Sequence, residues 1–261
     1  GEHVSVNGGA FVSEGNTSAV NAGSTYTHNF ATTYDFSAAG SYTLRLVVQN
    51  TAASDPVAIN DTLTVLIKQL ANPAITLITG SDFLDDFEGL ADSTYRNGQI
   101  GLSGGDRYDF RSTTVYGRVR PFINSGIAYS GNQALTLDAD RYNAGGTADS
   151  LKATFNLTAH TGAPDDLRLD FVYKNHTQGP DNANQVWIRG DDSKAWIAVY
   201  DLYANQPEPG SYKKSSSIEL TDILRANSQD FSSSFQIRFG QFGTLLAADN
   251  ETGAGYTFDD L

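Results

Sequence analysis

The sequence predicts an all-β protein, and two observations lead to this fold class. Nearly every apolar segment is short, rich in β-branched or aromatic residues, and bounded by Gly, Asn, Asp, Ser or Pro, which is the pattern of strands joined by turns. Only residues 220–227 look helical, because Thr221 can cap a first turn that Ile223 and Leu224 continue. We therefore expect antiparallel sheets and one helix of one or two turns.

The first predicted module covers residues 1–72. Residues 42–48 alternate around Tyr42, Leu44, Leu46 and Val48, and residues 63–67 repeat this pattern in a closing strand. A period of two is typical of half-buried antiparallel strands. We expect a small β-sandwich in this part of the chain.

Two short motifs support that expectation. Gly40 and Tyr42 open one strand, and Asn60 to Leu63 spell N-D-T-L before the next. The segment resembles the immunoglobulin-like adhesion and spacer modules of the CARDB kind found in large secreted proteins of Bacteroidetes. The resemblance implies an immunoglobulin-like β-sandwich that acts as a spacer. The family's opening strand has no counterpart here and the chain contains no Met, so we expect a segment of a larger polypeptide.

Ala71, Asn72 and Pro73 form a short predicted linker, and the second module covers residues 73–261. Its strands are expected to be longer and its loops larger. We expect strands at 83–87, 114–119, 133–138, 150–157, 167–173, 185–189, 195–200, 217–220, 235–239 and 256–261. So many strands without alternating helices predict a jelly-roll β-sandwich.

Three motifs of this module carry a second resemblance: Asp85 to Gly89 (DDFEG), Gly131 to Leu135 (G-x-Q-A-L) and Gly255 to Asp260 (G-Y-x-F-D-D). They are similar to the MAM-like and cleaved-adhesin-like jelly rolls of secreted bacterial proteases and adhesins. The resemblance implies binding or accessory duties and supplies no catalytic residues.

Composition narrows the classes of partner. There are 30 acidic residues against 17 basic ones, a formal charge of −13, which disfavours nucleic acid and anionic membrane surfaces. No apolar run approaches the roughly 18 residues that span a bilayer. Low Lys and Arg content with many Gly, Asn, Asp, Ser, Thr and Tyr favours a secreted or cell-surface protein.

No catalytic pattern stands out, so we expect no enzyme. The chain has no Cys, no G-x-S-x-G and no H-E-x-x-H, and its four histidines, His3, His28, His160 and His176, are scattered. Acidic pairs such as Asp165–Asp166 and Asp191–Asp192 could run glycosidase chemistry. They lie in segments that are predicted to be turns, where the Asp side chain usually hydrogen-bonds the nearby backbone.

The candidate ligand site is an aromatic platform. If Asp191 and Asp192 form a two-residue hairpin loop, Arg189 faces Lys194 and Trp187 faces Trp196, with Tyr200 on the same face. We predict that Trp187, Arg189, Trp196 and Tyr200 bind the ligand. The alternative is that these rings belong to the core.

The second candidate site is a structural Ca²⁺ site, which needs six to eight oxygen ligands. Glu88, Asp138, Asp259 and Asp260 lie at strand ends near both limits of the second module. They are the predicted ligands, and the alternative is that they are solvated charges.

The sequence therefore predicts a non-catalytic binding or spacer region of a secreted or cell-surface adhesin. The jelly roll would bind a glycan or a surface protein. An accessory or targeting region of a secreted protease is the alternative.

Overall fold

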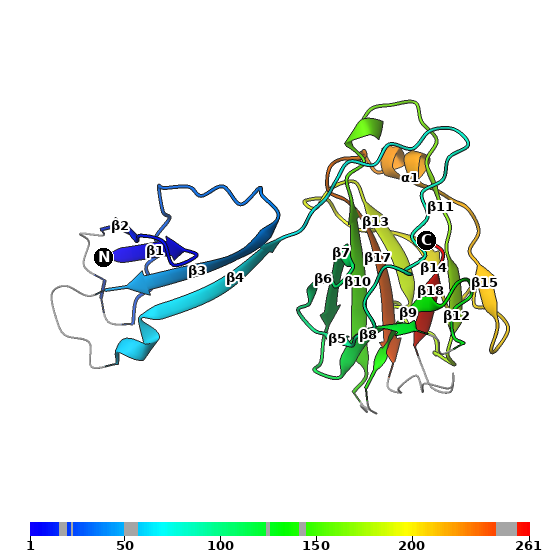
Figure 1. Cartoon of the computed structure of the whole chain (residues 1–261), viewed down its shortest axis with the longest axis horizontal. Coiled ribbons are helices and arrows are strands. Elements are labelled where there is room, and N and C mark those ends of the chain that lie inside the picture. The colour runs from blue at the N-terminus through cyan, green and yellow to red at the C-terminus, as the bar shows by residue number, and fades with distance from the viewer. Residues whose placement is uncertain (16–19, 22, 50–56, 124–125, 141–144, 244–254) are drawn as a thin grey trace. The chain divides into compact units, whose positions relative to one another are not determined.

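The computed structural model describes residues 1–15, 20–21, 23–49, 57–123, 126–140, 145–243 and 255–261 (Figure 1). The chain divides into two compact units, Gly1–Ala71 and Asn72–Leu261. Antiparallel strands build both units, and α1 (Leu220–Ala226) is the one α-helix in these ranges. The all-β prediction and the short helix are confirmed. No helix in the described ranges is long and apolar enough to cross a membrane.

The first unit is a four-stranded antiparallel sheet in the order β2-β1-β3-β4. Its elements are β1 (Glu2–Val6), β2 (Val12–Glu14), β3 (Gly40–Val48), the 3₁₀ turn η1 (Ala58–Asn60) and β4 (Thr62–Gln69). The alternating apolar residues pair across β3 and β4, with Tyr42 opposite Ile67 and Leu44 opposite Val65. Tyr42, at 9% exposure, is the one large apolar side chain that is buried among this unit's described residues.

The second unit contains two six-stranded sheets and a two-stranded one (Figure 1). The first sheet has the order β14-β13-β17-β10-β7-β6, the second β15-β12-β18-β9-β8-β5, and the small sheet pairs β11 with β16. The strands are β5 (Tyr95–Arg96), β6 (Ile100–Leu102), β7 (Gly105–Ser112), β8 (Gly117–Ile123), β9 (Gln133–Ala139), β10 (Thr147–Phe155), β11 (Arg168–Leu169), β12 (Val172–Asn175), β13 (Gln185–Arg189), β14 (Ile197–Asp201), β15 (Tyr212–Lys214), β16 (Ile218–Glu219), β17 (Phe235–Gly243) and β18 (Tyr256–Asp259), and the 3₁₀ turn η2 spans Thr158–His160.

Aromatic side chains join the two large sheets. Phe239 on β17 and Phe258 on β18 lie 4.7 Å apart between ring centroids, and Phe171 lies 5.4 Å from Phe239 in an edge-to-face arrangement. Edge-to-face and offset pairs of this spacing are favourable beyond the area that they bury. The core of this unit therefore lies between the sheets.

Several details differ from the predicted strands. The predicted strand 167–173 is divided into β11 and β12, which belong to different sheets, and β15 was not predicted. Residues 83–87 are not a strand, because only Asp85 pairs with the chain end, through two backbone hydrogen bonds with Leu261 of 2.8 and 3.0 Å. The sequence also gave no indication of β5, β6 and β7, which are interrupted by Gly98, Gly101 and Gly104 at positive φ. Frequent glycines hide the period of two that identifies a strand.

Candidate functional site

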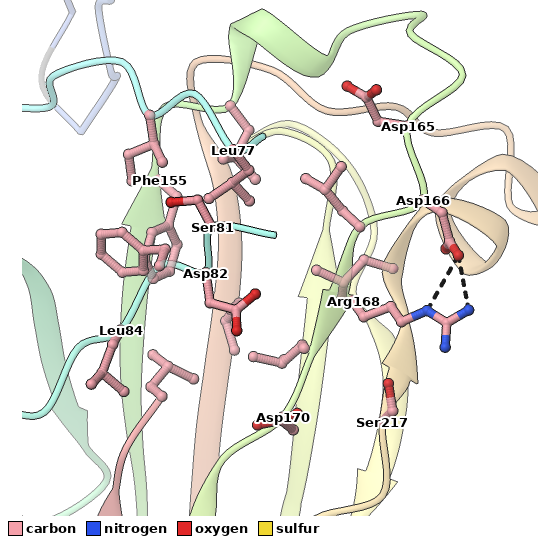
Figure 2. A pocket seen from close by; sticks show the side chains of 18 of the residues that line it. Leu77, Ser81, Asp82, Leu84, Phe155, Asp165, Asp166, Arg168, Asp170 and Ser217 are labelled. Atoms are coloured by element: carbon pink, nitrogen blue, oxygen red, sulfur yellow. Dashed lines mark hydrogen bonds and ion pairs between the residues drawn. The ribbon is translucent and has the colours of Figure 1, made fainter. Parts of the chain in front are cut away.

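A cleft of about 1100 Å³ opens in the second unit (Figure 2). It lies between the segment 75–84, which precedes the first strand of this unit, and the residues around β10, β11, β16 and β17. Its floor is aliphatic and aromatic, and includes Phe155, Leu157, Leu167, Leu169, Leu220, Phe235 and Ile237. Open clefts with apolar walls and a few polar groups are the usual form of a ligand site.

Backbone hydrogen bonds hold the segment 75–84 against the sandwich. Ile75 N donates to Asn156 O at 2.8 Å, which continues the parallel bridge between Ala74 and Asn156. Leu77 N donates to His160 Nε2 at 3.1 Å. This second bond places the apolar side of the segment over the floor of the cleft.

His160 is therefore a structural residue. It is buried, its Nε2 accepts the Leu77 amide, and its Nδ1 lies 2.6 Å from Asp165 Oδ2. An acceptor Nε2 requires the proton on Nδ1, where it is donated to Asp165. Although a His–Asp pair supplies two of the three members of a hydrolytic triad, the lone pair on Nε2 that a base would need already accepts the Leu77 amide here.

The rim of the cleft is acidic. Five of its lining residues are Asp82, Asp165, Asp166, Asp170 and Asp260, against two basic ones, Arg168 and Lys214. Arg168 is neutralised by Asp166 at 2.8 Å and by Glu219 at 2.9 Å, and Lys214 by Asp170 at 2.9 Å. Figure 2 shows the Arg168–Asp166 pair on one wall and exposed Asp82 on the facing segment. The rim therefore carries an excess of negative charge above an apolar floor.

The predicted aromatic platform lies on the outer face of the six-stranded sheet that contains β13, β17 and β10. Trp187, Arg189 and Trp196 are half-buried there, and they are joined by Arg238 from β17. The Arg238 guanidinium lies 4.1 Å from the Trp187 ring centroid and 4.5 Å from that of Trp196, and the Arg189 guanidinium lies 4.4 Å from Trp196. Trp187, Arg189, Trp196 and Arg238 form what we call the Trp–Arg cluster.

Two parts of the platform prediction are wrong. Trp187 pairs with Ala198 instead of Trp196, because the connection between β13 and β14 is longer than the two residues expected. A register shift next to Val186 then turns Tyr200 to the inner face, where it is 7% exposed and packs against Phe171. Tyr200 is a core residue.

Three of the four predicted metal ligands converge on the loop before β9. Glu88 Oε1 accepts the amides of Asn132 and Gln133, both at 2.7 Å. Asp259 Oδ2 accepts the amides of Tyr129 and Ser130 at 2.8 and 3.1 Å, and Asp260 Oδ1 accepts the Ser130 hydroxyl at 2.7 Å. These three residues tie the first and last segments of the unit to one loop.

Asp138 does not join them. It is buried towards the opposite end of β9, where Arg118 Nε donates to it at 2.7 Å and Arg120 also contacts it. Burial raises the pKa of Asp138, and the two guanidinium groups act in the opposite direction. The prediction that Asp138 shares a metal with the other three carboxylates is wrong, because its charge is balanced by arginines.

Within the ranges that the structure describes, no three His, Cys, Asp or Glu side chains close around a common point that could hold a metal ion. Burial and the adjacent Asp260 raise the pKa of Asp259 to about 6, although the loop amides lower it. The loop before β9 is therefore rich in oxygen ligands and in crowded negative charge, but it is not a closed cage.

Arg238 and the cleft were not predicted from the sequence, and the reasons differ. Arg238 alternates with buried Phe235, Ile237 and Phe239, so the period of two could have placed it outward. The cleft depends on where the segment 75–84 lies in space, and no local pattern encodes that placement.

Comparisons with known proteins give distant similarities. No family model and no curated protein matches the chain. The K2 cleaved adhesin domain of Lys-gingipain is 11% identical, with a TM-score of 0.38 over 68% of this chain and 94% of that domain. TmCBM61 in complex with β-1,4-galactotriose is 13% identical, with a TM-score of 0.34 over 62% of this chain and 87% of that one. These TM-scores are too low to support a conclusion about this chain.

Proposed function

We propose that the chain is a non-catalytic binding region of a secreted or cell-surface protein, and that the second unit holds a protein ligand in the cleft. The observation that carries the proposal is the acidic rim above an apolar floor. An extended peptide with aliphatic and basic side chains complements both features. The first unit, with its thin core, is proposed as a spacer.

Charge complementarity favours a basic peptide over a neutral glycan in this cleft. Sugar rings are usually held by aromatic faces and planar polar groups, whereas this floor is mainly aliphatic, with Leu167, Leu169 and Leu220 among its residues. Basic side chains would meet Asp82 and Asp165 at the rim. The affinity for such a peptide would therefore fall as the salt concentration rises.

The test uses an immobilised array of peptides that vary in their numbers of Leu and of Lys or Arg. We expect binding to peptides that contain both kinds of residue. The Asp82→Lys variant should weaken this binding about tenfold, because it places a positive charge on the rim. Asp106→Lys is the matched control, since Asp106 is also exposed and lies outside the cleft.

Equal binding by the two variants, or no binding to any basic and apolar peptide, would refute a peptide site in the cleft. A panel of protease, esterase and glycoside substrates tests the other half of the proposal. Robust turnover by the pure protein would contradict a non-catalytic role.

We also propose that the loop before β9 binds a structural Ca²⁺ with Glu88, Asp259 and Asp260. The crowding of Asp259 and Asp260, with the raised pKa of Asp259, supports this proposal because a cation would relieve it. Since the three carboxylates do not close around one point, the ion would take further ligands from loop carbonyls and water, as Ca²⁺ often does.

A further inference from the structure

The Trp–Arg cluster carries two positive charges whose described hydrogen bonds and ring contacts are all with uncharged groups. Arg189 Nε donates to Gln236 Oε1 at 2.7 Å, and its guanidinium also donates to Lys194 O at 3.3 Å. Arg238 stacks on the two indole rings. Neither arginine pairs with a carboxylate in the described part of the chain, which is unusual in a protein with a formal charge of −13.

The arginines also oppose each other. Burial lowers the pKa of Arg238, and the nearby Arg189 lowers it further. Lys152 is the cross-strand neighbour of Arg238 on β10, and it is paired with Asp109 at 3.0 Å. Asp191, in the loop after β13, accepts the Ser193 amide and hydroxyl. These hydrogen bonds lower its pKa, and the charges of Lys194 and Arg189 act in the same direction, so Asp191 balances part of the Arg189 charge without forming an ion pair with it. An anion that binds here would therefore contact the Arg189 and Arg238 guanidinium groups, which already lie close together and are partly desolvated.

Backbone packing fixes the position of the cluster. A side chain at Gly240 would lie 2.6 Å from Trp187 Cζ3, so the indole rests directly on this glycine of β17. Trp187 in turn supports the Arg238 guanidinium, which is the cross-strand neighbour on the same strand pair. Preorganised guanidinium groups lose little entropy when they bind a planar anion.

We propose that the Trp–Arg cluster binds the anionic groups of an acidic polysaccharide. Guanidinium groups bind carboxylate or sulfate through paired hydrogen bonds, and the exposed parts of the indole rings offer apolar surface to the sugar. This site lies on the outer face of the β13–β17 sheet and does not depend on the cleft, so either proposal can fail without the other.

Intrinsic fluorescence tests the proposal directly, because Trp187 and Trp196 are the only tryptophans in the chain. The protein is titrated with polygalacturonate in one arm and dextran sulfate in a second, with neutral dextran as the control. We expect a saturable change in tryptophan emission with at least one acidic polysaccharide and none with dextran. The two arms distinguish a carboxylate from a sulfate ligand.

Variants separate the cluster from general charge effects. Arg189→Gln should weaken binding about tenfold, since hydrogen bonds between charged partners are the strong ones. Arg225→Gln, an exposed arginine on α1 with the same loss of charge, should leave it unchanged. If Arg189→Gln lowers the melting temperature, the Arg189→Lys variant is tested instead. Lysine keeps the positive charge but cannot form the paired hydrogen bonds of a guanidinium group, so we expect weaker binding.

Three results would overturn the proposal. They are no emission change with either acidic polysaccharide, equal effects of the Arg189 and Arg225 variants, and equally tight binding of poly-glutamate. The last result would show that the site recognises charge on any chain instead of a polysaccharide.

Discussion

Asp149 is a buried carboxylate that contributes to the pH dependence of the stability of the second unit. It lies on β10 at 3% exposure, and Gln241 Nε2 donates to it. Burial raises its pKa to about 7, and the nearby charge of Asp138 acts in the same direction. An unfolded aspartate titrates near pH 3.9, so the folded state takes up a proton at a higher pH than the unfolded state.

The sign of the effect follows from this order of pKa values. As pH falls from about 7.5 to 5, the folded protein gains a proton that the unfolded chain does not, and the free energy of unfolding rises by about 2 kcal/mol. Asp149→Asn should remove this part of the pH dependence. Urea unfolding at pH 5, 6 and 7.5 measures it, with exposed Asp106→Asn as the control.

An unchanged pH dependence in Asp149→Asn would show that the carboxylate is already charged at pH 5 in the folded protein. The comparison with the parent protein is essential, because other groups also contribute to the pH dependence. Asp259 contributes in the same direction, whereas the partly buried Glu14 and Asp191, whose pKa values are lowered, contribute in the opposite one.

At the same scale, the sequence predicts which residues are charged but not which partner each one meets. Glu88, Asp259 and Asp260 converge as expected for strand ends that lie side by side. Asp138 instead faces Arg118 across the β8–β9 pair. The alternation of Arg118 and Arg120 along β8 was the available signal, and only the strand pairing shows that both reach one carboxylate.

Among the elements, the β13–β14 hairpin illustrates the limit of register prediction. The bounds of β13 are those expected, Gln185–Arg189. The loop is longer than predicted because Asp191 forms its own turn, accepting the Ser193 amide at 2.7 Å, and because the Gly190 amide donates to Gln229 at 2.8 Å. In addition, the pairing shifts by one residue between Val186 and Trp187. Such a shift moves every later side chain to the other face of the sheet, which explains why Tyr200 is buried.

The segment 75–84 is a second element whose role is set by tertiary contacts. It has apolar residues at Ile75, Leu77 and Phe83, as a strand would, but its anchors are the distant Asn156 and His160. Local propensity can indicate that such a segment is buried on one side. It cannot indicate that a cleft remains between the segment and the sandwich.

For the whole molecule, the alternating pattern predicted the all-β class because short polar turns separate nearly all the apolar strands. The strands within the glycine-rich residues 95–112 were not predicted, because their sequences lack a clear period of two. The pairing order of the two large sheets could not be read from the sequence, because it joins strands as distant as β10 and β17.

The calcium proposal predicts a change in the stability of the whole second unit. A metal ion whose free concentration is about a hundred times its dissociation constant adds about 2.7 kcal/mol to the free energy of unfolding. We expect excess chelator to lower the melting temperature by several degrees and added Ca²⁺ to restore it. Glu88→Gln should lose this response, and Asp106→Asn should keep it.

Identical melting curves in chelator and in millimolar Ca²⁺, with no metal found by elemental analysis, would refute the calcium site. The hydrogen bonds of Glu88, Asp259 and Asp260 to the loop would then be sufficient to hold it.

The most direct measurement blocks the cleft and asks whether the peptide still binds. Because the chain has no Cys, Ser217→Cys gives a single thiol at an exposed position that lines the cleft (Figure 2). Labelling it with a bulky maleimide should abolish binding of the best peptide from the array. The same label on Ser103→Cys, which is exposed and lies outside the cleft, should leave binding unchanged. If labelled Ser217→Cys binds the peptide as tightly as the unlabelled protein, the cleft is not the ligand site.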